Sequence, residues 1–371
     1  MENELIYQLA LSKVPGIGTV SAKKLIRHFG EARSIFKANR PLLRKVCGPD
    51  RADAILHFNG FQELEKEQSY LEKNSMRLLF ITDKDYPQRL LSYNKAPILL
   101  FYKGNADLNN PKVIAVVGTR SPSEYGKHIT SLLIKELASS GLLIISGLAY
   151  GIDAVAHQAA LNNHVPTVGV LGHGLDQVYP QQHTSLARQM AQQGGLLTQF
   201  NIGSSPENYN FPIRNQLVAG MSDALIVIET ASRGGSMLTV GNAIECNKKV
   251  FAFPGRINDL KSSGCNALIR GGKARLLTSA QQLIEEMQWD GMTKKPDAQQ
   301  VTLFPIPAGE PDLSEDEKKV LHLLRERGSL SLDELAAGSC QRNSSLSMSL
   351  LNLELQGWID SRPGKMYQLR Q

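Results

Sequence analysis

Six short apolar runs, several of them rich in β-branched residues, recur through the middle of the chain. They cover residues 113–117, 142–145, 167–171, 196–200, 224–228 and 250–253. The stretches between them, such as 126–140, 183–193 and 236–247, have helix-like patterns. Strands that alternate with helices at this spacing form βαβ units. Because the runs are almost wholly apolar, each strand is expected to be buried on both faces. The pattern therefore predicts an α/β fold with a mostly parallel sheet and helices on both sides.

Residues 1–75 carry short helical patterns broken by Gly and Pro, with a weak internal repeat. The pattern LxKVxG at residues 11–16 recurs at residues 43–48. Each copy predicts two helices joined by a glycine turn. In the first copy the turn VPGIG, at residues 14–18, resembles a helix-hairpin-helix motif, in which backbone N–H groups hold a DNA phosphate without reading sequence. This turn either binds phosphate or only packs two helices together.

The C-terminal part of the chain predicts a separate small domain. Residues 289–311 contain four Pro and no periodicity, which indicates a linker. Residues 312–371 predict three helices, the first opened by the capping box Ser314-x-x-Glu317, and a β-hairpin, which together resemble a winged helix. The third predicted helix has one basic residue, Arg342, so a protein contact or a regulatory role is favoured over DNA reading. The predicted domains are 1–75, 76–288 and 312–371.

The composition excludes several classes of protein. Hydrophobic residues make up 42% of the 371 residues and charged residues 20%, which fits a chain that folds around a core. No apolar run approaches the ~20 residues of a membrane span, and the acidic N-terminus is unlike a signal peptide. The four Cys form no CxxC pair, so neither a disulfide scaffold nor a metal site is expected. No cofactor is expected either, and the expected location is a reducing cytoplasm.

The formal net charge of +6 favours a polyanionic partner only weakly. Residues 1–80 hold 13 Lys and Arg against 9 Asp and Glu, and residues 81–290 hold 18 against 15. Residues 291–371 hold 10 against 11. Because the positive excess lies in the first two blocks, a nucleic-acid interface is expected there and not in the C-terminal block.

Loops rich in Gly and other small residues follow all six predicted strands. The carboxyl ends of parallel strands meet at one edge of the sheet, where ligands bind in open α/β folds. Small residues let a ligand approach the backbone, and helix N-termini offer unpaired N–H groups. Arg120, Arg233 and Arg256 lie in three of the loops. These features favour an anion-binding edge; alternatively, the glycines only let the turns close tightly.

Two common nucleotide-binding motifs are missing from the sequence. The chain contains neither GxxxxGK[ST] nor GxGxxG, which disfavours ATP hydrolysis and dinucleotide binding. A row of loops suits a chain of phosphates better, and bases could stack on the aromatic rings of Tyr179 or Phe211.

Six motifs occur in order over roughly residues 80–280. They are GTR at 118–120, SGLAxGIDxxAH at 146–157, LGxGLDxxYP at 171–180, FPxRN at 211–215, GSxxT at 235–239 and FPG at 253–255. This set resembles the DprA, or Smf, family of bacterial DNA-processing proteins. The resemblance implies an extended Rossmann-like domain, flanked by an N-terminal helical domain of the helix-hairpin-helix or SAM-like type and a C-terminal winged-helix-like domain.

The resemblance also implies a function. Members of the family bind single-stranded DNA, form a homodimer, protect incoming single strands during natural transformation and load the RecA recombinase onto them. The family's phosphate contacts map to Gly118, Thr119, Arg120, Arg214, Asn215, Gly235, Ser236 and Thr239. Further residues of the loop-bearing edge complete the candidate DNA-binding set: Ser146, Gly147, Gly151, Gln181, Phe211 and Gly234. No catalytic residue is expected.

Two positions depart from the pattern of many family members. Gln181 follows Tyr-Pro where many members have Lys, and Gln216 follows Arg-Asn where many have Arg. Each change replaces a potential phosphate contact with a neutral amide. If both positions face DNA, binding is expected to be weaker and less dependent on salt.

Two further classes of function compete with DNA binding. Asp153 and His157 share a helix face and could form an acid–base pair, although Asp153 is equally explained as a helix cap and His157 as its hydrogen-bond partner. A phosphoribohydrolase-like enzyme on a related fold is the main alternative, with Glu245 as its candidate acid. Its Pro-Gly-Gly-x-Gly-Thr motif is, however, absent from residues 232–239. A third possibility is a scaffold that binds an acidic protein.

Overall fold

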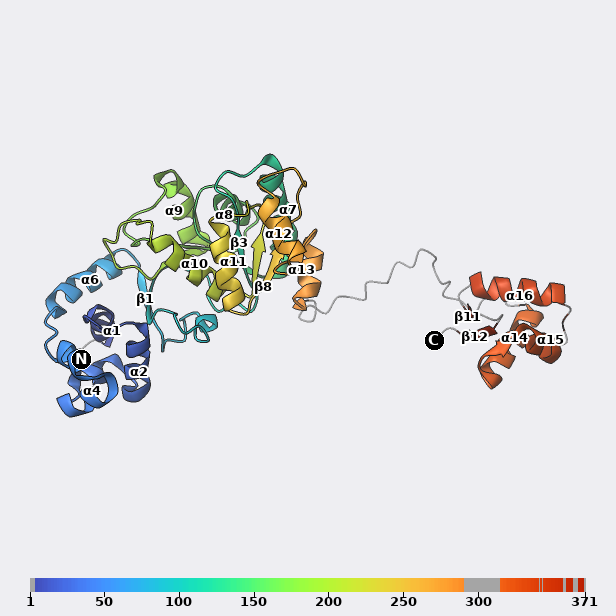
Figure 1. The fold of residues 1–371 in the computed structure, drawn as a ribbon, viewed down its shortest axis with the longest axis horizontal. Coiled ribbons are helices and arrows are strands. Elements are labelled where there is room, and N and C mark those ends of the chain that lie inside the picture. The colour runs from blue at the N-terminus through green and yellow to red at the C-terminus, as the bar shows by residue number, and fades with distance from the viewer. Residues whose placement is uncertain are drawn as a thin grey trace. The chain divides into compact units, whose positions relative to one another are not determined.

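The structure is a computed structural model that describes residues 4–289, 314–339, 341, 343–355, 358–362 and 366–369. It divides into two compact units, Met1–Met292 and Thr293–Gln371, which are described separately (Figure 1). The predicted boundary at residue 75 falls inside the first unit. Apart from Trp289, the predicted linker 289–311 lies outside the described residues. None of the described helices is both long and apolar enough to span a bilayer.

A nine-stranded sheet forms the centre of the first unit, in the order β1-β2-β6-β5-β4-β3-β7-β8-β9. Strands β3 to β9 pair in parallel, and β1 and β2 add an antiparallel edge beside β6. The strands are β1 (Arg77–Phe80), β2 (Leu99–Gly104), β3 (Val113–Val117), β4 (Leu143–Ser146), β5 (Thr167–Val170), β6 (Gly195–Thr198), β7 (Ala224–Val227), β8 (Lys249–Ala252) and β9 (Arg275–Leu276). The six predicted strands are confirmed as β3 to β8.

Each face of the sheet packs against its own set of helices. Because successive strand residues point to opposite faces, Ile114 and Val116 lie in one apolar core while Val113 and Ala115 lie in the other. The first core includes residues of α7 (Glu124–Leu137), α8 (Ile152–Asn162) and α13 (Ala280–Glu286). The second includes residues of α10 (Asn210–Met221), α11 (Ser236–Glu245) and α12 (Ser263–Arg270). The two-sided burial expected from the apolar runs is therefore confirmed.

The N-terminal helices follow the predicted repeat. A glycine turn joins the helices of each pair: α1 (Glu4–Lys13) with α2 (Thr19–Phe29), and α4 (Arg40–Cys47) with α5 (Pro49–Leu56). Helices α3 (Ala32–Lys37), α6 (Phe61–Lys73) and α9 (Thr184–Gln193) pack in the same apolar core. The turn at residues 14–18 borders a cavity of about 240 Å³, whose other walls include Leu99 and Asn201 at the edge of the sheet. Phosphate binding by this turn stays a prediction.

The second unit contains the predicted three helices and β-hairpin. Its helices are α14 (Glu315–Arg327), α15 (Leu332–Ser339) and α16 (Asn343–Leu355), and its strands are β10 (Leu330–Ser331), β11 (Ile359–Arg362) and β12 (Met366–Leu369). The predicted capping box is present, since Ser314 Oγ accepts a hydrogen bond from Glu317 N–H and the Glu317 carboxylate accepts one from Ser314 N–H. Arg342 lies outside the described residues.

Some elements were not predicted. Strands β1 and β2, with the sequences RLLF and LLFYKG, are short apolar runs, which periodicity alone does not distinguish from buried helix segments. Strand β9 is only two residues long. Helix α10 contains Pro212, which normally argues against a helix. Here Pro212 lies in the first turn, where no intrahelical N–H bond is lost.

Candidate functional site

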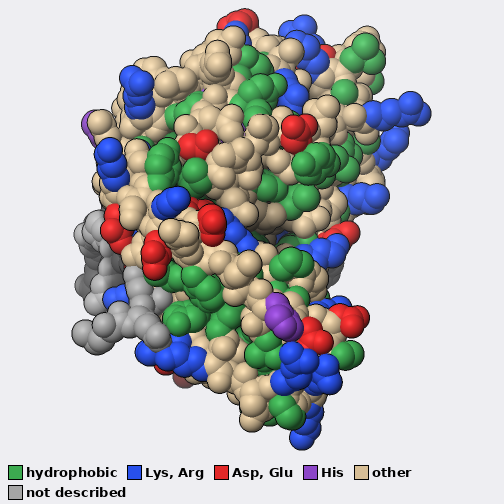
Figure 2. Space-filling view, turned by 90° about the vertical axis from the view of Figure 1, so that its left-hand side faces the viewer, with side chains coloured by type: hydrophobic (Ala, Val, Ile, Leu, Met, Phe, Trp, Pro, Cys, Tyr) green, Lys and Arg blue, Asp and Glu red, His purple; other side chains and the backbone are tan. Residues whose placement is uncertain are grey.

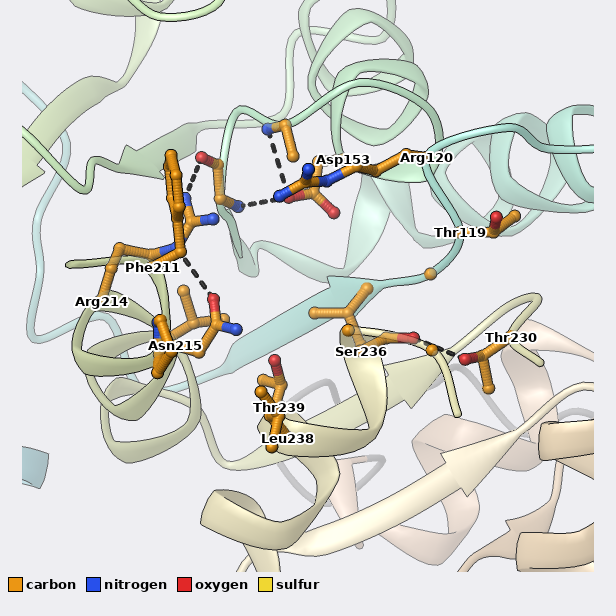
Figure 3. Close-up of a pocket in the computed structure, with 18 of the residues that line it drawn as sticks. Thr119, Arg120, Asp153, Phe211, Arg214, Asn215, Thr230, Ser236, Leu238 and Thr239 are labelled. Carbon is orange, nitrogen blue, oxygen red and sulfur yellow. Dashed lines mark hydrogen bonds between the residues drawn. The ribbon is translucent and has the colours of Figure 1, made fainter. Parts of the chain in front are cut away.

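The largest cavity described lies at the carboxyl ends of β3, β4 and β7 (Figure 3). Its volume is about 500 Å³, and we call it the main cavity. Strand β3 lies between β4 and β7. Strands β4 to β6 therefore extend the sheet to one side of β3, and strands β7 to β9 extend it to the other side. Ligands of open α/β folds bind at such a point. The main cavity is walled by the loops after these three strands and by the start of α10.

The loop after β3 is hydrogen-bonded to both neighbouring loops. Thr119 N–H donates to the carbonyl of Glu229 at 2.7 Å, and Thr119 carbonyl accepts from Ile152 N–H at 3.1 Å. The Arg120 side chain is exposed, and its guanidinium lies 5.8 Å from the centroid of the Phe211 ring. The backbone of this loop is therefore fixed, while the charged end of Arg120 is free to meet an anion over the cavity.

A buried carboxylate anchors the far end of the same loop. Glu229, only 1% exposed, accepts hydrogen bonds from Ser123 N–H at 2.8 Å and from Ser123 Oγ–H at 2.6 Å. Ser123 Oγ in turn accepts from Gly126 N–H and caps α7. Glu229 is missing from the predicted site. The available signal was an acidic residue placed directly after a buried apolar strand.

The loop after β4 runs beneath the loop after β3. Gly151 has φ +83°, and a Cβ at this position would lie 2.2 Å from the carbonyl oxygen of Thr119. Ser146 is fully buried and its hydroxyl donates to the carbonyl of Val116 at 2.6 Å. The Asp153 carboxylate accepts from the N–H groups of Gly147 and Ala149 at 3.1 and 3.3 Å. Asp153 lies in the first turn of α8 but does not cap it, because its carboxylate binds N–H groups of the loop that precedes the helix.

Arg214 and Asn215, the predicted pair, lie on α10 and differ in their surroundings. Arg214 is only 5% exposed. Its Nη1 donates to the carbonyls of Gly147 and Val170, and its Nε donates to Asn215 Oδ1 at 2.9 Å. Burial lowers the pKa of Arg214, an effect that the charge of Asp153 opposes. Burial likewise raises the pKa of Asp153, against the charge of Arg214.

These contacts give Arg214 a supporting role, and the phosphate contact expected of it stays a prediction. Nη1 is directed at backbone carbonyls and Nε at the Asn215 side chain, so Arg214 joins the loop after β4 to the end of β5 and orients its neighbour. Because Asn215 Oδ1 accepts from Arg214, the amide nitrogen of Asn215 is left facing the main cavity (Figure 3). In this structure Asn215 offers the donor to a ligand, and Arg214 is a positioning residue.

The N-terminus of α11 forms the opposite wall. Gly234, Gly235, Ser236 and Thr239 line the main cavity here. Ser236 Oγ–H donates to Thr230 Oγ1 at 2.7 Å. Among the described residues, the N–H groups of Gly235 and Ser236 have no hydrogen-bond acceptor. They lie at the positive end of the helix dipole, which favours an anion.

A smaller hollow of about 70 Å³, the aromatic cleft, adjoins the main cavity. Tyr150, Tyr179, Phe211 and Arg120 line it. The rings of Tyr179 and Phe211 lie 6.0 Å apart, and Tyr150 and Tyr179 are 41% and 46% exposed. Such exposed rings beside an anion-binding wall provide stacking surfaces for nucleobases.

The structure brings most of the predicted site together. Eleven of the fourteen predicted residues line the main cavity: Gly118, Thr119, Arg120, Gly147, Phe211, Arg214, Asn215, Gly234, Gly235, Ser236 and Thr239. Ser146 and Gly151 support the loops from behind. Gln181 is exposed but lines neither hollow, and Gln216 lines neither as well. The basic loop residues Arg233 and Arg256 lie outside both hollows.

The candidate acid and base groups of the enzymatic alternatives do not converge on the main cavity. Among the described residues that line the main cavity, Asp153 has the only carboxyl group, and it is occupied by two backbone N–H donors. Glu245 is exposed at the end of α11 and lines neither hollow. His157 is fully buried and pairs through Nδ1 with Thr167 Oγ1 at 2.7 Å, and burial lowers its pKa to about 3. The described residues contain no cluster of three or more candidate metal ligands.

A family model described as DNA recombination-mediator protein A matches residues 77–288, more than half of the chain. The chain belongs to the DprA family. A second model, the DprA winged helix domain, matches residues 305–365 of this DprA-family chain. Protein Smf of a Synechocystis strain is 34% identical over 99% of both chains, and Protein Smf of Escherichia coli is 35% identical over 83% of this chain and 82% of that protein.

Solved structures agree with this membership. DNA processing protein A from Streptococcus pneumoniae has a TM-score of 0.62 at 35% identity, covering 76% of this chain and 97% of that one. The corresponding protein from Helicobacter pylori, whose structure concerns its single-stranded DNA binding mode, has a TM-score of 0.52 at 30% identity and covers 58% of this chain and 96% of that one. The Rossmann-like and winged-helix expectations, and the DprA resemblance, are confirmed.

Proposed function

We propose that this DprA-family chain binds single-stranded DNA across the main cavity and the aromatic cleft. The observation that carries the proposal is the convergence of anion donors on one cavity. Exposed Arg120, the Asn215 amide and the unpaired N–H groups at the start of α11 all border it. These groups suit phosphates, since charged and backbone N–H donors at a helix terminus bind them without reading sequence.

The aromatic cleft supports a preference for single strands over duplexes. Tyr179 and Phe211 can stack only on bases that are not already stacked within a helix. The test compares labelled oligonucleotides of equal length in single- and double-stranded form, by fluorescence anisotropy. Tighter binding of the single strand is expected at every salt concentration. Equal or tighter binding of the duplex would exclude the proposed role of the cleft.

We further propose that the bound strand is protected and passed to the RecA recombinase, in the cytoplasm, during natural transformation. The family description as a recombination mediator supports this step. Two measurements test it: digestion of a single strand by an exonuclease, and the single-strand-dependent ATPase of RecA, each with and without the chain. Slower digestion and earlier onset of the ATPase are expected. Unchanged rates in both assays contradict the mediator role. We propose that the chain works by binding and without catalysis.

We also propose that the chain forms a homodimer. After β8, the side chains of Ile257 and Leu260 are 94% and 81% exposed, which is unusual for large apolar residues close together on a monomer surface. An interface through this loop would remove both from water. Light scattering on the eluting protein is expected to give twice the mass of one chain. Replacing both residues with Asp is expected to halve that mass; a native chain that elutes as a monomer contradicts the proposal.

A further inference from the structure

Positive charge is concentrated in one stretch of the N-terminal helices. Residues 13–51 contain ten Lys and Arg against two Asp and Glu, a formal net charge of +8, whereas the whole chain carries +6. This stretch covers α2, α3 and α4. Figure 2 views the molecule from the side of these helices and shows Lys and Arg side chains beside Asp, Glu and hydrophobic ones.

Most of these cations are used within the fold. Lys13 forms an ion pair with Glu67, and Arg40 and Arg44 both lie within ion-pair distance of Asp53. Lys23 donates to the carbonyls of Tyr93 and Asn94 at 3.1 Å each. Arg51 donates to the carbonyls of Gly16 and Cys47. These contacts hold the helices to one another or to the sheet domain, and Arg33 and Lys37 have partners as well.

Three cations lie together without such partners. Lys24 and Arg27 on α2 and Lys45 on α4 are exposed, and among the described residues none of them forms an ion pair or a hydrogen bond through its side chain. With His28 and Val46 they line an open groove of about 370 Å³, the basic groove. Lys24 and Arg27 are one helical turn apart, so their charges follow one another along the groove.

We propose that the basic groove binds the phosphate backbone of DNA, as a second contact surface for the strand held at the main cavity. This inference rests on the proposed function. Three exposed cations along an open groove suit a chain of phosphates better than a single small anion, which would be held by a closed pocket. The groove offers charge and almost no aromatic surface, so it is expected to bind any base sequence.

The test compares two double variants with the same loss of charge. Lys24→Gln/Lys45→Gln changes the groove, and Lys66→Gln/Lys73→Gln changes two exposed lysines on α6 outside it. Both are measured with an oligo-dT of about 8 nucleotides, a site size typical of one domain, and with one several times longer. The salt slope is the slope of the logarithm of the binding constant against the logarithm of the salt concentration. Losing two phosphate contacts lowers its magnitude by about 1.4. If the variant and the native chain bind equally at about 1 M salt, the variant then binds about 25-fold more weakly at about 0.1 M.

The groove variant is expected to lose this affinity for the long strand and to bind the short one like the native chain. The α6 variant is expected to match the native chain on both. Equal long-strand affinity and salt slope for the two variants would overturn the inference. This test is independent of the test of the proposed function. Native binding of the short strand by a chain changed at Arg120 would contradict DNA binding at the main cavity, and it would leave the basic groove untouched. Circular dichroism confirms that both variants fold.

Discussion

Replacing Gly151 with Ala tests whether the loop after β4 positions the loop after β3. A Cβ at residue 151 would lie 2.2 Å from the Thr119 carbonyl oxygen, where real contacts stay above 3.0 Å. The clash involves backbone atoms, so the Thr119–Arg120 segment has to move by most of 1 Å. Overpacking of this kind costs about 1–3 kcal/mol. The backbone of Gly151, φ +83° and ψ −129°, adds about 1–3 kcal/mol for a residue with a side chain.

A matched control separates the clash from the backbone strain. Gly328 has nearly the same backbone angles, φ +78° and ψ −119°, but a Cβ there meets nothing within 4 Å. Gly151→Ala is therefore expected to lose about 2–6 kcal/mol of unfolding free energy, and Gly328→Ala only the strain part, within its own unit.

Binding of labelled oligo-dT is measured by anisotropy at a temperature where both variants are folded. Displacement of Arg120 removes at most one phosphate contact, so Gly151→Ala is expected to bind up to about fivefold more weakly at about 0.1 M salt. Gly328→Ala is expected to bind like the native chain. A folded Gly151→Ala protein with native affinity would refute the positioning role of this glycine.

Three further outcomes follow from the contacts. Glu229→Gln replaces charge-assisted bonds to Ser123 with neutral ones, so unfolding free energy falls by about 1–2 kcal/mol and DNA affinity falls with it; an unchanged melting temperature counts against this. Phe211→Ala is expected to cost about 1–3 kcal/mol of single-strand binding without changing the salt slope, and a changed slope contradicts stacking. His157, with a folded pKa of about 3, stays neutral while the unfolded chain protonates below about 6.5. As the pH falls from 7 to 5, protonation of His157 in the unfolded chain therefore lowers the unfolding free energy by about 2 kcal/mol. Denaturant titrations of His157→Gln are expected to lack this loss.

Local patterns were sufficient to predict six of the nine strands and the edge of the sheet at which their loops gather. The buried runs at β3 to β8 are continuous and apolar, so their type and the position of the loops after them followed directly. Strands β1 and β2 were missed because a short apolar run rich in Leu and Phe suits a buried helix segment equally well. Their strand conformation depends on pairing with β6, a contact between distant parts of the sequence.

The sequence placed most candidate residues at one cavity but did not predict the contacts that they make there. Arg214 was identified, but its burial against the Gly147 and Val170 carbonyls depends on how α10 packs over the sheet. No sequence pattern encodes that packing. Glu229 was missed for a related reason: its partner Ser123 lies 106 residues away in the chain. Tertiary contacts of this kind decide whether a charged side chain meets a ligand or supports the groups that do.

The central claim is that anion donors around the main cavity hold single-stranded DNA. The most direct measurement is the salt dependence of oligo-dT binding for Arg120→Gln, which removes an exposed cavity-lining charge, beside Arg270→Gln, which removes an exposed charge at the end of α12. For Arg120→Gln we predict a salt slope lower by about 0.7 and binding about fivefold weaker at about 0.1 M salt. For Arg270→Gln we predict native values. Equal effects of the two substitutions, or native binding by Arg120→Gln, would contradict the claim.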